Sequence, residues 1–245
     1  MAMSLPQPDC DYLAASSSGP VPDSSVTSGK ATEPGAMAGA GRVAMQRLSP
    51  AKRAVDVVVA LVLLVLVAPL IGVLAVIIML DSRGAPFFVQ TRVGHGGREF
   101  PFIKLRTMVQ DAEARLGELI NLNEAQPPLF KMKRDPRVTR IGAFLRRSSL
   151  DELPQLWNVV RGDMSLVGPR PSLPREVATY TPEQMRRLSV IPGMTGLWQV
   201  SGRSDLDFEH AVALDLSYID TWSMVLDLTL LIKTLLVVVR PRGAY

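Results

Sequence analysis

The feature that most constrains this chain is an uncharged apolar run, residues 57–80, bracketed by Asp56 and Asp81. At a rise of 1.5 Å per residue, a helix of these about 24 residues would be roughly 36 Å long, which is enough to cross a bilayer. A single spanning helix is therefore one interpretation. A helix buried in a globular core is a second, because the run is apolar on every side.

Two features of the run favour a third interpretation, a re-entrant helix that enters and leaves the membrane on the same side. Pro69 lies near the middle of the run, where proline kinks a helix. Basic residues flank both ends, and the positive-inside rule then places both ends in the cytoplasm. They are Arg42, Arg47, Lys52 and Arg53 before the run, and Arg83, Arg92, Arg98, Lys104 and Arg106 after it. Asp56 would be costly in lipid unless it lies at the interface or pairs with Lys52 or Arg53.

The chain divides into three parts around this run. Residues 1–48 are rich in Ser, Pro, Gly and Ala and are predicted to be a disordered tail, because they bury too little apolar area to fold. Residues 49–83 form the predicted membrane-embedded helix. Residues 84–245 are predicted to form a mostly helical α+β domain with one short β-hairpin and with helices at the membrane interface.

The composition limits the kinds of site that the chain can form. Cys10 is the only cysteine, so no disulfide framework or cysteine-based metal site is possible. His95 and His210 are the only histidines, which excludes a histidine-rich zinc site. The net charge of +4 and the pI of about 9.5 suit an anionic partner, such as anionic lipid, a nucleotide or nucleic acid.

A β-hairpin is predicted directly after the apolar run, with a turn at Gly94-His95-Gly96-Gly97. The chain then leads into Lys104 and Arg106, which alternate with apolar residues and would share one face of a strand. Further helices are predicted over about 111–125, 141–147, 182–188 and 207–218, and a loop-rich segment over 191–203.

The C-terminal segment, residues 222–239, is the second most apolar part of the chain. It carries Asp227 and Lys233 within a run of about 16 apolar-rich residues, which is short for a spanning helix. We therefore predict a packed or surface-lying helix there, and no second span.

Residues 146–171 hold the candidate chemistry, because two adjacent carboxylates, Asp151 and Glu152, lie there between clusters of arginine. One interpretation is structural: Ser149 and Glu152 have the spacing of a capping box, which would only start a helix. The other is functional, because the N-terminus of such a helix also favours a bound phosphate.

The same stretch contains the groups that phosphoryl chemistry needs. A carboxylate can attack phosphorus to give an acyl phosphate, and its neighbour can hold Mg²⁺ against phosphate oxygens. The planar fork of arginine matches phosphate oxygens, and the candidates are Arg146, Arg147, Arg161 and Arg170. Arg170 lies between two prolines that restrict its backbone, although a rigid turn with a solvated arginine would look the same.

Taken in order, the motifs of the chain resemble those of the bacterial sugar transferase family, which contains small monotopic polyprenyl-phosphate phosphoglycosyl transferases. The resemblance covers roughly residues 48–240. Its motifs are Lys52-Arg53-x-x-Asp56, the break at Pro69, Phe87-Phe88-x-Gln90-x-Arg92-x-Gly94, Lys104-x-Arg106-Thr107-Met108, Ser149-Leu150-Asp151-Glu152-Leu153-Pro154-Gln155 and Gly168-Pro169-Arg170-Pro171.

The resemblance implies a two-step transfer of hexose 1-phosphate from UDP-hexose to undecaprenyl phosphate. Asp151 would attack the β-phosphate, release UMP and carry the phosphosugar until the lipid phosphate accepts it. Glu152 matches the second acidic residue of the family, which takes part in Mg²⁺ binding. Arg170 would contact phosphate or nucleotide, and Lys104 and Arg106 would have phosphate-binding or structural roles.

The resemblance also implies a place in the cell and a pathway. The enzyme would lie in the bacterial inner membrane, with its catalytic domain on the cytoplasmic face, and would begin exopolysaccharide or O-antigen synthesis without a nucleic-acid partner. The family breaks its membrane helix at a Ser-Pro pair, whereas this chain has Ala68-Pro69 and lacks the hydroxyl that could satisfy a freed carbonyl.

Residues 195–203 resemble the branch that uses UDP-galactose or UDP-glucose, and the absence of a large extra membrane domain favours galactose. Two other functions stay open from the residues alone. One is a non-catalytic, membrane-anchored module that binds polyanions through its basic face. The other is a hydrolase that uses the same carboxylates with water as the acceptor. The sequence leaves the oligomeric state open, a homo-oligomer included.

Overall fold

The computed structural model describes residues 49–119, 123–124, 132, 134–202 and 206–239. The predicted tail, residues 1–48, lies outside this part of the chain. In chain order the elements are α1 (Pro50–Asp81), β1 (Phe87–Val93), η2 (His95–Gly97), β2 (Glu99–Leu105), α2 (Leu116–Leu119), α3 (Arg140–Ser148), η4 (Leu150–Glu152), α4 (Gln155–Arg161), β3 (Ser165–Val167), α5 (Pro174–Val177), η5 (Gln184–Ser189), β4 (Gly193–Thr195), α6 (Leu197–Ser201), α7 (Phe208–Thr221) and α8 (Met224–Val239).

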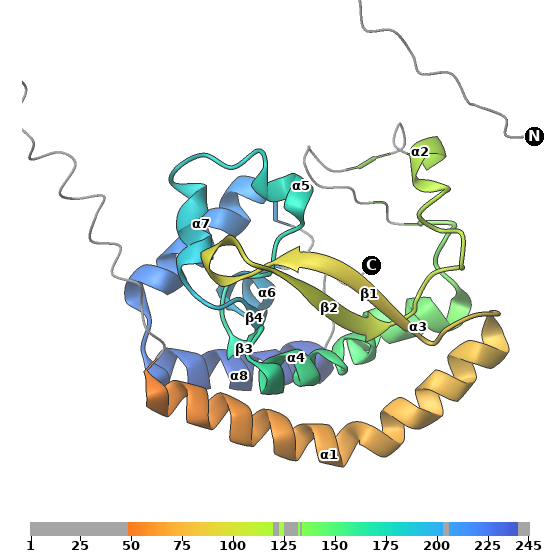
Figure 1. Ribbon diagram of the computed structural model, residues 1–245, viewed down its shortest axis with the longest axis horizontal. Coiled ribbons are helices and arrows are strands. Elements are labelled where there is room, and N and C mark those ends of the chain that lie inside the picture. Colours follow the sequence, from red (N-terminus) through yellow and green to blue (C-terminus); the bar gives the residue numbers. More distant parts are fainter. Residues whose placement is uncertain (1–48, 120–122, 125–131, 133, 203–205, 240–245) are drawn as a thin grey trace, which may run out of the picture.

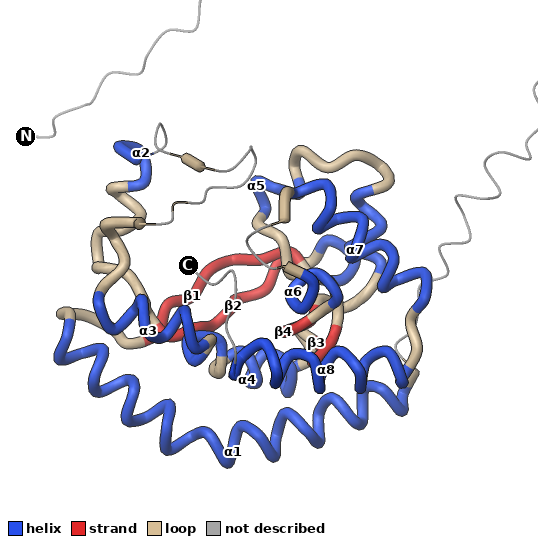
Figure 2. The backbone as a smooth tube through the Cα atoms, turned by 180° about the vertical axis from the view of Figure 1, so that it is seen from behind, coloured by secondary structure: helices blue, strands red, loops and turns tan. Residues whose placement is uncertain are grey.

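The apolar run forms α1, one helix that lies along one side of the molecule and bends near its middle (Figures 1 and 2). Pro69 lies inside this helix, and the convex side of the bend faces away from the other elements. Only 17% of the most apolar part of α1 is buried, so the interpretation as a core helix is wrong. Among the described residues, α1 is the one helix long and apolar enough to cross a membrane.

The regions near both ends of α1 nevertheless pack against other elements of the molecule. Ala60 belongs to the main core, with Val159 of α4, Met164 and Leu230 of α8, all of them 0% exposed. Nearer the C-terminus of α1, Leu74 and Ile78 form a smaller cluster with Leu105 and Leu145 from β2 and α3. Leu64, Val67 and Ile71 pack against these clusters along the middle of the helix, whereas Val65 and Leu66 are 66% and 69% exposed, so one side of α1 presents apolar side chains to the surroundings.

The predicted β-hairpin is confirmed. β1 and β2 pair antiparallel, from Phe87 opposite Leu105 to Val93 opposite Glu99, and η2 closes the turn. A second, parallel pair, β3 with β4, was not expected, and the segment predicted as loop-rich holds both β4 and α6. Strands of three residues show too few alternating positions for a sequence pattern to reveal them.

The predicted helices are mostly confirmed, as α3, η5, α7 and α8. Thr181, three residues before η5, bonds to the first residue of that element: its hydroxyl accepts from the Gln184 N–H at 3.3 Å, and its own N–H donates to Gln184 Oε1 at 2.9 Å. The prediction over 111–125 is wrong at its start, because residues 111–115 form turns and the Ala112 carbonyl accepts from Arg137 instead. Parts of that segment lie outside the described residues.

The C-terminal apolar segment forms α8, which packs with one side and exposes the other. Leu230 and Asp227 are 0% and 6% exposed, whereas Val225 and Leu235 are 75% and 68% exposed. This pattern fits the predicted packed or surface-lying helix. In Figure 1, α8, α4 and α3 lie between α1 and the hairpin, so these three helices form a layer on the inner side of α1.

Candidate active site

Asp151 and Glu152 lie in η4, a single 3₁₀ turn between α3 and α4. Ser149 adopts a left-handed backbone with φ of 56°, which ends α3, and its side chain does not cap η4. The predicted capping box is therefore wrong. The predicted position of the dyad at the start of a helix agrees with the structure, because Leu153 and Pro154 have right-handed helical backbones and lead directly from η4 into α4.

Asp151 is buried at 8% exposure, and Glu152 beside it is half-buried. Burial and the neighbouring charge of Glu152 raise the pKa of Asp151 to about 7, although Lys104 and Arg146 act in the opposite direction. A carboxyl group with this pKa is a far stronger base than an exposed aspartate and is still ionised in a large fraction of molecules at neutral pH. Such a shift, together with cationic neighbours, is typical of functional sites.

Two cations from different elements face Asp151. Lys104 comes from β2, with its ammonium 5.4 Å from the centre of the Phe88 ring, and burial and the charge of Arg146 lower its pKa to about 8. Arg146 comes from the last turn of α3, and its Nε donates to Thr107 Oγ1 at 2.9 Å. α3 approaches Thr107 this closely because residue 142 is glycine, and an added Cβ would lie 1.9 Å from the Thr107 carbonyl oxygen.

A second pair of cations extends the site towards the Gly168–Ser172 loop. Arg92 is buried in β1, where it donates to the Pro171 carbonyl at 3.0 Å and to Gln90 Oε1 at 2.8 Å. Burial and the charge of Arg170 lower the pKa of Arg92 to about 9. Arg170 is exposed and lies 5.3 Å over the centre of the Trp198 ring. Because Arg92 and Arg170 also lower the pKa of Lys104, the four cations form one positively charged surface next to Asp151.

Buried polar contacts fix the loop that carries Arg170. Arg187 pairs with Asp215 at 2.7 Å, and it donates to the Arg170 carbonyl at 3.3 Å and to the Tyr180 hydroxyl at 2.6 Å. Tyr180 in turn donates to Ser172 Oγ at 2.6 Å. The loop backbone is therefore held from beneath, while the Arg170 side chain stays open to a ligand.

Comparison with known proteins identifies the family of this chain. The family model of bacterial sugar transferases matches residues 46–241. The chain belongs to the bacterial sugar transferase family. This finding confirms the resemblance that the sequence motifs indicate.

Three relatives show how similar this sugar transferase is to named proteins. The UDP-galactose-lipid carrier transferase of Erwinia amylovora is 45% identical over 198 residues, which are 79% of this chain and 41% of the relative. The exopolysaccharide production protein ExoY of Rhizobium meliloti (strain 1021) is 41% identical over 199 residues, 80% of this chain and 88% of ExoY. The UDP-glucose:undecaprenyl-phosphate glucose-1-phosphate transferase of Caulobacter vibrioides is 38% identical, over 100% of this chain and 88% of the relative. The chain thus spans about two fifths of the first relative and most of the other two.

Among the described residues, two others with predicted phosphate-binding or structural roles, Arg106 and Arg147, form no hydrogen bond or ion pair with Asp151. Arg106 follows the last residue of β2 and donates to the carbonyl and hydroxyl of Ser82 at 2.6 and 2.9 Å, so it fastens the chain after α1. Arg147 is exposed at the end of α3. Neither is among the main charges that shift the pKa of Asp151. Arg161, at the far end of α4, pairs with Asp163 at 3.3 Å.

The donor set beside Asp151 suits Mg²⁺ better than a metal that needs a full protein cage. Within the described ranges, no group of three or more His, Cys, Asp or Glu side chains could hold a metal ion. Mg²⁺ is usually held by one or two carboxylates, several waters and the phosphates of the substrate. Glu152 and Asp151 offer two such carboxylates, and Glu152 is accessible to solvent.

The sequence alone does not identify Arg92 and Trp198 as site residues of the sugar transferase. Arg92 counts there as one of the basic flanks of the apolar run and as part of a family motif, without a role in the site. A signal was available, because Gln90 and Arg92 alternate along one predicted strand and polar residues that share a strand face need a common environment. For Trp198, no local pattern indicates a contact with Arg170, which is 28 positions earlier in the sequence.

Proposed function

We propose that this sugar transferase moves hexose 1-phosphate from a UDP-hexose to undecaprenyl phosphate and releases UMP. The reaction would be the membrane step that begins exopolysaccharide or O-antigen synthesis. The names of the relatives support the substrates, since one is named for UDP-galactose and a lipid carrier and another for UDP-glucose and undecaprenyl phosphate. The observation that carries the proposal is Asp151, a buried carboxyl group with a pKa of about 7 next to Lys104 and Arg146.

Chain length does not distinguish galactose from glucose. The short length of this chain favoured galactose from the sequence alone. The relative from Caulobacter vibrioides is named for glucose, yet this chain spans 88% of it, so a short glucose-type relative exists. The proposal therefore names the hexose as galactose or glucose.

In the first step, a carboxylate oxygen of Asp151 attacks the β-phosphorus of the UDP-hexose. A new O–P bond forms, and the bond from that phosphorus to the bridging oxygen breaks, so UMP leaves with the electron pair. Asp151 then carries hexose 1-phosphate as an acyl phosphate. Lys104 and Arg146 lie where they can bind the phosphate oxygens, and Arg170 and Arg92 extend the positive surface towards the nucleotide.

In the second step, a phosphate oxygen of undecaprenyl phosphate attacks the same phosphorus. The bond to Asp151 breaks, the carboxylate is restored, and undecaprenyl diphosphate hexose leaves. Both steps use the same cations, because the phosphoryl group stays in one place while the attacking and leaving groups exchange.

Glu152 is the proposed protein ligand of Mg²⁺, with Asp151 beside it. When bound, the ion would neutralise part of the diphosphate charge and favour the departure of UMP. Glu152 has a second effect that does not depend on the ion, since its charge raises the pKa of Asp151 and so increases the basicity of the nucleophile.

We further propose that the protein is monotopic in the bacterial inner membrane, with α1 as a re-entrant helix and the catalytic domain on the cytoplasmic face. Support comes from the bend of α1 and from the exposed apolar sides of α1 and α8. A UDP-hexose made in the cytoplasm and a lipid-bound acceptor would both reach such a site.

A transfer assay with purified protein in lipid nanodiscs tests the proposal. Incubation with Mg²⁺, undecaprenyl phosphate and either UDP-galactose or UDP-glucose should release UMP and form lipid-linked hexose. Asp151→Asn should abolish both products, because an amide oxygen is a poor nucleophile, while UDP-hexose still binds. Absence of any nucleotide product would support the polyanion-binding module, and release of hexose phosphate without the lipid would support a hydrolase.

A further inference from the structure

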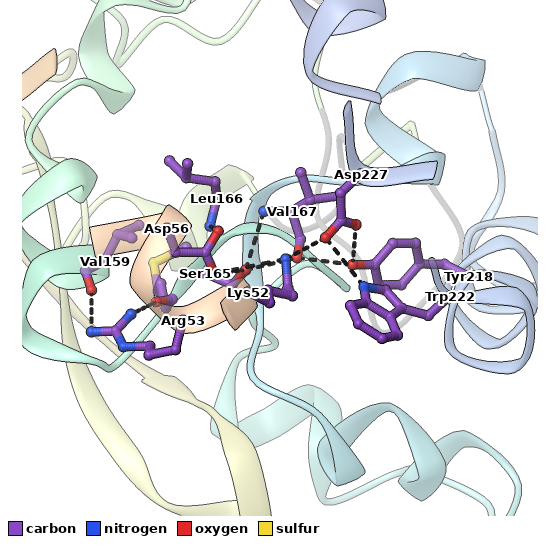
Figure 3. A network of polar contacts seen from close by, with 11 residues as sticks. Lys52, Arg53, Asp56, Val159, Ser165, Leu166, Val167, Tyr218, Trp222 and Asp227 are labelled. Carbon is purple, nitrogen blue, oxygen red and sulfur yellow. Dashed lines mark hydrogen bonds and ion pairs between the residues drawn. The ribbon is translucent and has the colours of Figure 1, made fainter. Parts of the chain in front are cut away.

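The first turns of α1 carry Lys52, Arg53 and Asp56, whose charges point into the protein. A basic residue that sets membrane topology is expected at the surface, near lipid headgroups. Lys52 and Asp56 are instead 3% exposed each, and Arg53 is only partly exposed. Figure 3 shows their side chains directed at neighbours from α4, β3, α7 and α8.

Asp56 holds β3, the strand that leads into the Arg170 loop. Its Oδ2 accepts from the Ser165 hydroxyl at 2.7 Å, and its Oδ1 accepts from the Leu166 N–H at 3.4 Å (Figure 3). Ser165 is 0% exposed, and Arg170 follows the end of β3 by three residues. The Asp56 carboxylate of α1 is therefore bonded to β3, the strand that precedes Arg170.

Lys52 joins the same carboxylate to α8. Its Nζ lies 2.5 Å from Asp227 Oδ2 and 3.7 Å from Asp56 Oδ2. Asp227 also accepts from the Tyr218 hydroxyl at 2.8 Å and from Trp222 Nε1 at 3.1 Å (Figure 3). Burial and the charge of Asp227 raise the pKa of Tyr218 far above its usual value, so the hydroxyl stays a donor. All the charged groups of the cluster have partners, as buried charges require.

Arg53 contacts the C-terminal end of α4, the helix that follows Asp151 and Glu152. Its Nη2 donates to the carbonyls of Val159 and Val160 at 2.7 and 3.2 Å, and its Nη1 donates to the Met164 carbonyl at 3.3 Å. α4 ends here, at Gly162 with φ of 99°, so Arg53 binds carbonyls at the C-terminal end of a helix, where a cation is favourable. The N-terminus of α4 is three residues after Glu152.

We propose that Lys52, Arg53 and Asp56 are positioning residues for the transfer reaction. They fix α4, which follows Asp151, and β3, which precedes Arg170, to the first turns of α1, so the placement of α1 in the membrane also sets the geometry of the site. The inference rests on the proposed function for the reaction, but the contacts that carry it do not. Misplacement of reacting groups by about 1 Å can slow an enzyme on the order of 100-fold, so these contacts can control the rate.

The test compares variants of the full chain in nanodiscs. Asp56→Asn should raise the KM for UDP-hexose at least about tenfold, because it acts through Arg170. Ser165→Ala is milder and should raise the same KM about threefold. Asp56→Asn should cost little more in an Arg170→Met background, since contacts in one pathway are not additive. Arg53→Met should mainly lower kcat, because it acts through α4 and Asp151. Arg83→Met, which removes an exposed cation just after α1, is the matched control and should keep wild-type kinetics.

A second readout does not depend on transfer. The chain has three tryptophans, so 5-fluorotryptophan gives three ¹⁹F signals, and the Trp198 signal reports on the Arg170 loop. Asp56→Asn and Ser165→Ala should shift the Trp198 signal, and Arg83→Met should not. Unshifted Trp198 signals in both variants, or effects of Asp56→Asn that are fully additive with Arg170→Met, would overturn the inference. If the wild-type protein transfers no hexose, the proposed function fails, and the ¹⁹F shifts still decide whether the contacts position the loop.

Discussion

Asp151 is buried and lies next to cations, and these two opposing influences set the pKa of its carboxyl group. Burial and Glu152 raise the pKa of its carboxyl group to about 7, while Lys104 and Arg146 keep the ionised form accessible. Lys104 experiences the opposite change, since burial and Arg146 lower the pKa of its ammonium to about 8. At neutral pH the site can therefore hold a nucleophilic carboxylate next to a charged lysine.

These two pKa values predict a bell-shaped pH dependence of kcat/KM. Below about pH 7, activity should fall because the Asp151 carboxyl group is protonated and cannot attack phosphorus. Above about pH 8, it should fall because Lys104 loses the charge that binds phosphate. Lys104→Arg keeps its charge at high pH, so this variant should lose the alkaline fall and keep the acid one. A profile that is flat from pH 6 to pH 9 in the wild-type protein would contradict this assignment.

At the residue scale, the sequence predicts which residues lie near one another better than it predicts their hydrogen bonds. Asp151, Glu152, Lys104, Arg146 and Arg170 are all brought to one region, whereas Arg106 fastens the chain after α1. The spacing of residues 149–152 matches a capping box, but Ser149 has a left-handed backbone that ends α3, and a spacing pattern does not reveal this.

At the scale of elements, the position of α3 depends on one close approach. Gly142 leaves room for the Thr107 carbonyl, and this contact places Arg146 beside Asp151. The long elements, α1, β1, β2, α3, α7 and α8, follow from hydrophobic period and from turn and cap residues. β3 and β4 do not, since they are paired only by the tertiary fold and have three residues each.

Gly142→Ala should displace α3 and impair the site. The added methyl group would overlap the Thr107 carbonyl oxygen, which is backbone and cannot move aside alone. We expect a loss of stability of about 1–3 kcal/mol, typical of overpacking, and a fall in transfer of at least about tenfold. Thermal unfolding and UMP release measure the two effects.

Gly117→Ala is the matched control for this change. It lies in α2, and an added Cβ there has no atom within 4 Å. Alanine is the better helix former, so stability should stay the same or rise slightly. Equal behaviour of the two variants would contradict the role assigned to the close approach of α3.

The bend of α1 gives a topology prediction at the same scale. Tags placed before Lys52 and after Tyr245 should both be cytoplasmic in the wild-type protein, because both ends of a re-entrant helix lie on one side. Pro69→Leu restores the helical hydrogen bond and should straighten α1, so part of the N-terminal tag should become accessible from the periplasm. Labelling of tags with a membrane-impermeant reagent in spheroplasts measures this. A periplasmic N-terminal tag in the wild-type protein would restore the spanning helix.

At the scale of the whole molecule, α1 is bonded to elements on both sides of the candidate active site. The apolar outer sides of α1 and α8 are exposed, and the first turns of α1 contact α4, which follows Asp151, and β3, which precedes Arg170. The sequence motifs predict the family, and with it this general plan, because they occur along almost the whole chain. They do not predict that Lys52 binds Asp227, since the two residues are 175 positions apart.

The central claim, a covalent bond between Asp151 and the phosphosugar, has a direct test without the lipid acceptor. Protein in nanodiscs is incubated with Mg²⁺ and UDP-hexose labelled in the sugar, and the chain is analysed by intact mass and peptide mapping after a rapid acid quench. We predict a burst of UMP that is stoichiometric with protein, label on the peptide that contains Asp151, and transfer of that label to lipid when undecaprenyl phosphate is added. Release of UMP only after the lipid is added, with an unmodified chain before it, would contradict the covalent mechanism.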